Sequence, residues 1–222
     1  GYPIGTLHTR HDAIVGYMKE LASKSERAKF EIIGETYEHR KLVVLTVSAP
    51  SNIENLESIR KDHLQLVDPD KHVGDYADHK SVVLLGYNVH GNEPSSSEAA
   101  LLAAYYYVAG LHNEVTTALD EAVIMIDPNF NPDGRDRHST WANAYKANPL
   151  VSDPTDAEHN EMWPGGRTNH YWYDLNRDWL PLAHVESQAR IDFYHKWYPN
   201  VVTDFHEMGT NSTYFFEPTK PF

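Results

Sequence analysis

A histidine and a glutamate share one short turn, "HGNE", directly after the apolar run "SVVLLGY" at residues 81–87. His90 and Glu93 are separated by two residues, and both side-chain types bind zinc in proteins. A chain with 14 histidines is expected to contain about one H-x-x-E by chance, and this chain contains it at this turn. Spacing alone therefore does not distinguish a metal site from a surface histidine beside an acidic residue at a helix start.

A third candidate ligand follows a second apolar run, "NVVTDFHEM", at residues 200–208. Zinc in a hydrolase typically takes three protein ligands and leaves one position for water, so His206 can complete a set with His90 and Glu93. Cysteine is absent, which restricts any metal to His, Asp or Glu ligands. These three residues could therefore hold one zinc ion, or be unrelated surface and core residues.

Strand alternation ranks the acidic neighbours of His206. Asp204 lies two residues earlier and points to the same face, so it is either a carboxylate that orients the imidazole or a buried structural residue. Glu207 is expected on the opposite face, which ranks it below Glu93 as a ligand.

Two further stretches carry polar groups suited to an anionic substrate. In "YDLNRDW" (173–179), Asn176 and Arg177 could bind a carboxylate, because Arg binds it bidentately and Asn adds a donor; a surface arginine is the alternative. "NPDGRDR" (131–137) has the composition of a turn, in which Arg135 and Arg137 could stabilise an oxyanion or be solvated charges.

Local patterns predict the elements that position these residues. Apolar residues at helical spacing predict helices, and short apolar or alternating runs predict strands, the first two of them paired as a hairpin. Residues 136–173 carry neither pattern and are expected to be irregular. The expected helices cover about residues 9–25, 52–67, 94–110 and 180–198, and the expected strands cover about 29–38, 41–50, 81–87, 121–126 and 200–208.

Strands that alternate with helices predict a three-layer α/β/α sandwich around a mixed, largely parallel central sheet. Ligand sites in such sheets form at the carboxyl ends of strands. His90, the "NPDG" turn and His206 each follow a predicted strand, and that shared position is what favours a metal site over chance. A chain of 222 residues is expected to form a single domain, residues 1–222.

Composition excludes several classes of partner. The 19 basic and 32 acidic residues give a net charge of −13, which argues against nucleic-acid binding because that rests on clustered Lys and Arg. No stretch approaches the roughly 20 consecutive apolar residues of a membrane span. The hydrophobic content of 41% is that of an ordinary globular protein.

Taken together, the chain resembles the zinc metallocarboxypeptidases of the carboxypeptidase A/B type. The resemblance rests on the order of "EIIGETYEHRKLVVLTVS", "HGNE", "NPDG", "DLNRDW" and "DFHE" between about residues 10 and 217. It implies that His90, Glu93 and His206 bind zinc, and that Asn176 and Arg177 hold the C-terminal carboxylate of a peptide or protein substrate. It also implies a secreted or periplasmic hydrolase.

The chain departs from the family pattern at two places. The family places an arginine that polarises the scissile carbonyl about a dozen residues after "NPDG", and that count reaches Lys146, so the role falls to Arg137, to Lys146 or to neither of them. The family's general-base glutamate and a substrate-binding tyrosine lie well beyond the third ligand, and Tyr214 and Glu217 are too near His206 to match them. We therefore expect a catalytic domain truncated on its C-terminal side and inactive by itself.

Three functions are consistent with these residues. The leading hypothesis is a zinc-dependent exopeptidase that hydrolyses the C-terminal peptide bond, with a downstream glutamate as base. A zinc deacylase of N-acyl amino acids, similar to aspartoacylase and succinylglutamate desuccinylase, shares "HGNE" and the Asn-Arg pair. A non-catalytic module that binds peptide tails is the third.

Overall fold

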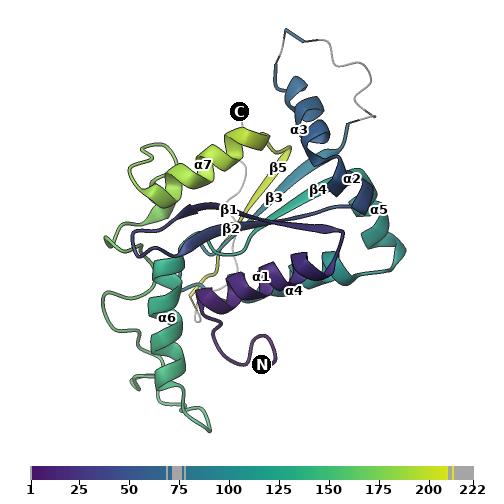
Figure 1. Ribbon diagram of the computed structural model, residues 1–222. Coiled ribbons are helices and arrows are strands. Elements are labelled where there is room, and N and C mark those ends of the chain that lie inside the picture. Colours follow the sequence, from purple (N-terminus) through teal and green to yellow (C-terminus); the bar gives the residue numbers. More distant parts are fainter. Residues whose placement is uncertain (1, 69, 72–76, 78, 210–211, 213–222) are drawn as a thin grey trace.

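The computed structural model describes residues 2–68, 70–71, 77, 79–209 and 212, so Tyr214 and Glu217 lie outside the described residues. Five strands form one sheet, and helices pack on it (Figure 1). The strands are β1 (Ala28–Glu35), β2 (Lys41–Val47), β3 (Ser81–Tyr87), β4 (Ala122–Asp127) and β5 (Val201–Phe205). The helices are α1 (His11–Lys24), α2 (Pro50–Glu54), α3 (Leu56–Gln65), α4 (Pro94–Ala109), α5 (Asn113–Glu121), α6 (Pro132–Tyr145), the 3₁₀ turn η2 (Leu175–Arg177) and α7 (Val185–Trp197).

The sheet is mixed, with strand order β1-β2-β4-β3-β5. β1 and β2 form the predicted antiparallel hairpin, and β2 pairs antiparallel with β4. β3 pairs parallel with both β4 and β5. Because β2 alone runs against the other strands of this sheet, the predicted largely parallel arrangement is confirmed.

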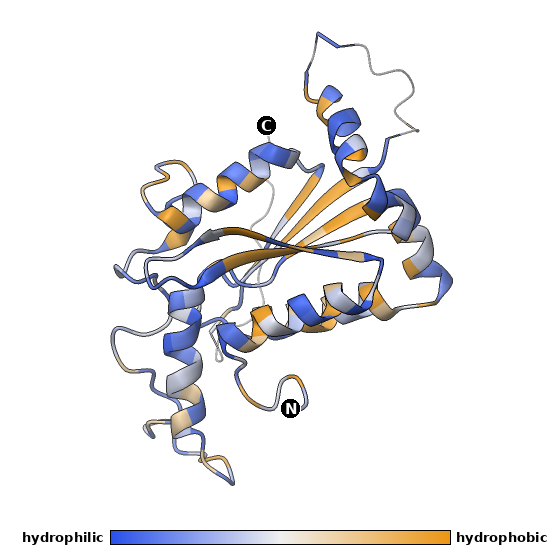
Figure 2. Ribbon diagram, in the orientation of Figure 1, coloured by the Kyte–Doolittle hydropathy of each residue, from blue (hydrophilic) through white to orange (hydrophobic). Residues whose placement is uncertain are grey.

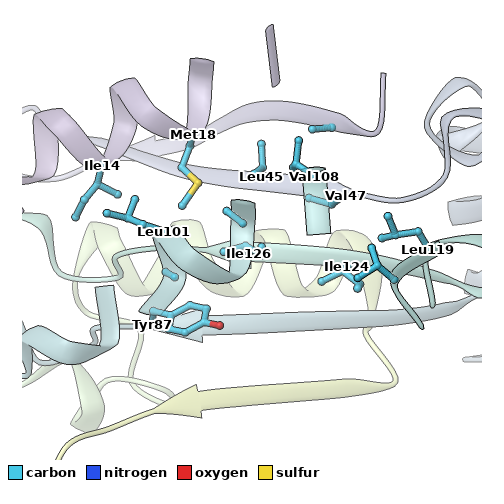
Figure 3. Close-up of a cluster of buried hydrophobic side chains, with 14 residues drawn as sticks. Ile14, Met18, Leu45, Val47, Tyr87, Leu101, Val108, Leu119, Ile124 and Ile126 are labelled. Carbon is cyan, nitrogen blue, oxygen red and sulfur yellow. The ribbon is translucent and has the colours of Figure 1, made fainter. Parts of the chain in front are cut away.

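Side-chain alternation gives the strands two apolar faces, as the orange strands of Figure 2 indicate. On β4, Ile124 and Ile126 face the cluster formed with α1, α4 and α5, whereas Val123 and Met125 face the cluster formed with α7. Figure 3 shows the first cluster, with Met18 of α1 and Leu101 of α4 over the sheet. Helices on both faces confirm the predicted three-layer sandwich. No helix within the described residues is long and apolar enough to cross a membrane.

Parallel pairing brings the carboxyl ends of three strands to one edge of the sheet. β3 ends at Tyr87, just before "HGNE"; β4 ends at Asp127, just before "NPDG"; and β5 ends at Phe205, just before His206. Tyr87 is registered opposite Phe205, and Gly86 opposite both Asp127 and Asp204. This register places segments that are distant in sequence beside one another, as the strand-end argument predicted.

The expectation that "NPDGRDR" is a turn and that residues 136–173 are irregular is wrong for residues 132–145, which form α6. The Asn131 side chain caps this helix by accepting a hydrogen bond from the Gly134 backbone N–H at 3.0 Å, and Pro132 occupies its first turn. The sequence of α6 has no apolar stripe from which a helix could be predicted, because its buried residues are largely polar. They include Asp133, Arg135 and His138.

Those polar residues tie α6 to the β1–β2 hairpin. Asp133 Oδ1 accepts hydrogen bonds from Thr36 Oγ1 at 2.7 Å and from Arg40 Nη1 at 2.8 Å. Asp136 Oδ2 accepts another from Arg40 Nε at 2.7 Å. The "GETYEHR" turn therefore anchors α6.

Two other expectations need smaller corrections. The helix predicted over residues 52–67 is divided, since α2 ends at Glu54 and α3 begins at Leu56. Helix α5, which was not predicted, precedes β4. Helices α2, α3 and α5 have 5, 10 and 9 residues, and the apolar periodicity of a helix is weakest in such short segments.

Two adjacent leucines of α4 provide a matched test of the core. Leu101 is 3% exposed in the cluster of Figure 3, and Leu102 is 57% exposed. We expect Leu101→Ala to lower the free energy of unfolding by about 2–5 kcal/mol, because it removes buried methyl groups and leaves a cavity. Leu102→Ala should change it by no more than about 0.5 kcal/mol. Urea denaturation measures both, and equal losses would contradict the assignment of the buried face.

Candidate metal centre

Three side chains meet at the carboxyl edge of the parallel strands. His90, Glu93 and His206 each offer a ligand atom within 4.8 Å of the other two. They are the one group of three or more His, Asp or Glu residues with this property in the described part of the chain. His90 and Glu93 are buried and His206 is exposed, so the group lies at the surface with a protected floor. The residues that sequence analysis selected as ligands are therefore brought together.

The Glu93 carboxylate bridges the two imidazoles. Its Oε1 lies 2.8 Å from His90 Nδ1, and its Oε2 lies 3.1 Å from His206 Nδ1. Oε2 also accepts a hydrogen bond from the Glu207 backbone N–H at 3.0 Å. Two nitrogens and two carboxylate oxygens are thus directed at one small region.

The opposite edge of each imidazole is held by another carboxylate. Asp174 Oδ1 lies 2.9 Å from His90 Nε2, and Asp204 Oδ2 lies 3.0 Å from His206 Nε2. The contact between Asp204 and His206 was one of the two predicted alternatives, whereas Asp174 was not identified. The sequence did offer one signal for Asp174, because it lies two residues before Asn176 in "YDLNRDW". This pairing fixes the rings so that both Nδ1 atoms face Glu93.

The contact between His90 and Glu93 shifts their pKa values in opposite directions. Burial by itself lowers the pKa of His90, but hydrogen bonds to Glu93 and Asp174 outweigh it and leave the pKa raised. Burial raises the pKa of Glu93, and its interactions with His90 outweigh this effect, so the pKa is lowered. The carboxylate is thus an ionised ligand group.

A tight turn after β3 sets the relative positions of His90 and Glu93. Asn88 has a positive φ of 63°, and its Nδ2 donates to the carbonyls of His90 at 2.7 Å and Glu93 at 2.9 Å. The Asn88 backbone N–H donates to Ser96 Oγ at 2.8 Å, which joins the turn to α4. An asparagine tolerates this left-handed conformation and satisfies the backbone of the turn at the same time.

Gly91 is required by close packing rather than by its φ. A Cβ at this position would lie 2.2 Å from the Arg135 backbone nitrogen and 2.5 Å from the Gly166 carbonyl oxygen. The start of α6 and the loop at residue 166 therefore press directly against "HGNE". Gly91 is therefore needed because any side chain at this position would collide with these two segments.

The basic residues singled out after "NPDG" are engaged away from the metal-site residues. Arg135 is fully buried and donates to the carbonyls of Thr9 and Pro94 and to Glu98. Arg137 donates to carbonyls of the loop at residues 165–169, and Lys146 donates to the Thr6 carbonyl. These bonds give the three cations structural partners.

A different arginine lies beside Glu93. Arg167 is exposed, with Nη1 at 3.9 Å from Glu93 Oε1 and Nη2 at 2.9 Å from Asp174 Oδ2. It follows Gly165 and Gly166 in a loop without regular structure, so no periodic pattern marked it. Proximity in the folded chain is what identifies it.

Asn176 and Arg177 lie in η2 next to the same group. Asn176 Nδ2 is 3.4 Å from His206 Nε2, and Asn176 Oδ1 accepts a hydrogen bond from Trp179 Nε1 at 3.0 Å. The Asp174 side chain caps η2 by accepting from the Asn176 backbone N–H at 2.9 Å. Arg177 is exposed, and its Nη1 donates to the Asn176 carbonyl at 3.0 Å. The pair therefore presents donors at the rim of the group.

The donor set fits zinc. Imidazole nitrogens and a carboxylate are common zinc ligands, and each imidazole carries the outer carboxylate partner typical of zinc-bound histidine. The same three side chains would hold the ion, with Asp174 and Asp204 outside them.

Known carboxypeptidases resemble this chain along most of its sequence. The sequence profile of the zinc carboxypeptidases matches residues 14–220. A probable carboxypeptidase 2 of Arthroderma benhamiae is 27% identical over 217 residues, which covers 96% of this chain and 32% of that protein. Carboxypeptidase 2 of Trichophyton rubrum is 27% identical over 225 residues, covering 100% of this chain and 32% of the relative. The chain thus spans about a third of the length of these relatives.

Solved structures share the fold. Carboxypeptidase A from Helicoverpa armigera superposes with a TM-score of 0.57 at 16% identity, over 91% of this chain and 46% of that one. A metallo-carboxypeptidase from Burkholderia cenocepacia gives a TM-score of 0.54 at 19% identity, over 88% of this chain and 39% of that one. Since the profile match covers nearly the whole sequence, the chain belongs to the zinc carboxypeptidase family.

Proposed function

We propose that the protein containing this chain is a zinc-dependent exopeptidase that removes residues from the C-terminus of peptides. The observation that carries the proposal is the convergence of both His Nδ1 atoms on Glu93, with Arg167 and Asn176 at the rim. Hydrolysis at a C-terminus needs metal ligands to polarise the scissile carbonyl. It also needs cationic or amide donors close by to bind the terminal carboxylate.

In this proposal His90, Glu93 and His206 hold one zinc ion. What zinc supplies when bound is a Lewis acid for the scissile carbonyl and an acidified water. Asp174 and Asp204 orient the imidazoles from outside. His206 is exposed, so a peptide can approach the cluster from that side.

Arg167 is the cation that we assign to the scissile carbonyl, in place of Arg137 or Lys146. Its guanidinium lies near Glu93 and is exposed, whereas those two side chains bond to backbone carbonyls elsewhere. A guanidinium adjacent to the ion can stabilise negative charge as it develops on the carbonyl oxygen. The salt bridge to Asp174 fixes its direction.

Asn176 and Arg177 are assigned to the terminal carboxylate of the substrate. A guanidinium can bind a carboxylate through two parallel hydrogen bonds, and the Asn176 amide adds another donor. This contact would limit hydrolysis to the last peptide bond. The general base is not assigned to any described residue, and a single-domain organisation and secretion or a periplasmic location stay predictions.

Zinc binding can be tested directly on this chain. We expect about one equivalent of zinc to remain after dialysis, and the variants His206→Gln and Glu93→Gln to retain little, because each removes a ligand. His195→Gln, on an exposed position of α7, is the matched control and should keep its zinc. Metal analysis by mass spectrometry gives the stoichiometry. Full zinc content in His206→Gln would refute the assigned ligand set.

Replacing the outer carboxylate of Asp174 should weaken zinc binding without abolishing it. Asp174→Asn keeps the shape of the side chain but weakens its interaction with His90 Nε2. We expect zinc affinity to fall by about 10–100-fold, as for other outer partners of zinc-bound histidines. Competition with a chelator measures the dissociation constant. Asp192→Asn, at an exposed position of α7, should leave it unchanged.

Exopeptidase recognition is tested with paired substrates in the full-length protein. N-acylated dipeptides with a free C-terminus should be hydrolysed, and their C-terminal amides should be poor substrates. Arg177→Gln should lower kcat/KM for the free acid by about 10–100-fold, the value of a lost charge-assisted hydrogen bond. Arg60→Gln, in α3, is the control. Equal hydrolysis of acid and amide would exclude this role of Arg177, and activity on N-acyl amino acids alone would favour a deacylase.

A further inference from the structure

A buried arginine lies behind the metal-site residues without a hydrogen bond. Arg190 of α7 is 4% exposed, and its Nε and both Nη atoms have no hydrogen-bond partner in the described structure. Its guanidinium carbon lies 3.8 Å from the centroid of the Trp179 ring and 4.3 Å from that of the Phe130 ring. The two rings meet edge to face, with centroids 6.4 Å apart. Arg190 therefore packs on the faces of both rings.

Stability alone does not account for this arrangement. A buried cation without hydrogen bonds loses its hydration and regains only part of that free energy, here from two aromatic faces and from attraction to nearby carboxylates such as Asp127 and Asp204. An apolar side chain of similar length would fill the same volume without this cost. Features that oppose stability in this way are concentrated at functional sites.

The aromatic pair is itself held by the carboxyl edge of the sheet. A Cβ on Gly86 would lie 2.6 Å from the Phe130 ring, so the absence of a side chain in β3 lets that ring lie against the strand. The Phe130 backbone N–H donates to the Tyr87 carbonyl at 2.9 Å. Phe130 also packs in a small cluster with Val89, Leu175 and Trp179. That cluster joins the segments that carry His90 and Asn176.

Trp179 connects Arg190 to the proposed substrate site. The indole Nε1–H donates to Asn176 Oδ1 at 3.0 Å, while Asn176 Nδ2 faces His206 at 3.4 Å from Nε2. An amide can be rotated by half a turn, which exchanges its oxygen and its NH₂ group. Because an indole nitrogen only donates, it selects the rotamer whose oxygen faces Trp179 and whose NH₂ faces the metal-site residues.

We propose that Arg190 is a positioning residue for recognition of the substrate carboxylate. By holding the Trp179 ring, Arg190 keeps the indole N–H on Asn176 Oδ1, so that Asn176 presents donors and no acceptor to the terminal carboxylate. The inference rests on the proposed function, because it gives Asn176 a carboxylate ligand.

Another route from Arg190 leads to zinc rather than to substrate. Asp204 Oδ1 is buried without a hydrogen-bond partner in the described structure, and its Oδ2 lies beside His206. An Arg190 that acted through Asp204 would alter the metal site. Zinc affinity therefore separates the two routes.

The test uses Arg190→Met in the full-length zinc-loaded protein, with N-acylated dipeptides as free acids and as amides. We expect KM for the free acid to rise about 10-fold, the loss of one hydrogen bond, with kcat changed less than about 2-fold. The amide should be unaffected, and the zinc dissociation constant should stay within about 2-fold. A purely structural role would lower kcat/KM for acid and amide equally.

Trp179→Phe provides a second variant, because it keeps a ring beside Arg190 and removes the N–H. It should raise KM for the free acid as Arg190→Met does, and the double variant should add little further, because the two residues act on one amide. Asn176→Ala separates the hypotheses. If Asn176→Ala leaves the preference for the free acid over the amide unchanged, the proposed carboxylate role of Asn176 fails. If it abolishes the discrimination while Arg190→Met and Trp179→Phe do not, the positioning role alone is overturned.

Discussion

The carboxylate of Glu93 is the interaction on which the arrangement of the site depends. It joins a histidine from the turn after β3 to a histidine from the end of β5, and Glu93 itself is 113 residues from His206 in the sequence. Neither imidazole could be directed so closely without its own outer carboxylate, Asp174 or Asp204. Each imidazole contacts an outer carboxylate through Nε2 and Glu93 through Nδ1. Both Nδ1 atoms therefore point to the same region, as binding of one metal ion by nitrogen and oxygen ligands requires.

Many of the buried polar side chains near this site hold the fold together. Asp133 and Arg40 tie α6 to the first hairpin, and Arg135 ties α6 to the start of α4. Gly91 then lets α6 press against the turn that carries His90. The motifs that support the family resemblance are therefore of two kinds. "HGNE" and "DFHE" carry candidate ligands, whereas "NPDG" and the hairpin turn hold the scaffold that keeps those ligands in register.

Asn176 shows how the apolar and polar parts of the molecule depend on each other. Its amide is fixed by an indole, the indole contacts a buried guanidinium, and the guanidinium lies on a ring that fits only because β3 carries Gly86. A hydrogen bond at the surface thus depends on packing within the sheet. Such coupling is expected where a site is formed on rigid elements rather than on loops alone.

The sequence by itself determined the strands, most helices, the α/β class and the three candidate ligands, because periodicity and strand-end position are local signals. It did not reveal α6, whose buried face is polar and so lacks an apolar stripe. It also did not distinguish among the arginines. A count along the chain reached Lys146, with Arg137 as an alternative, but the residue beside Glu93 is Arg167. Only the folding of the 146–173 loop against "HGNE" decides this. Partners of buried charges are chosen by distance in space, for which separation along the chain carries little information.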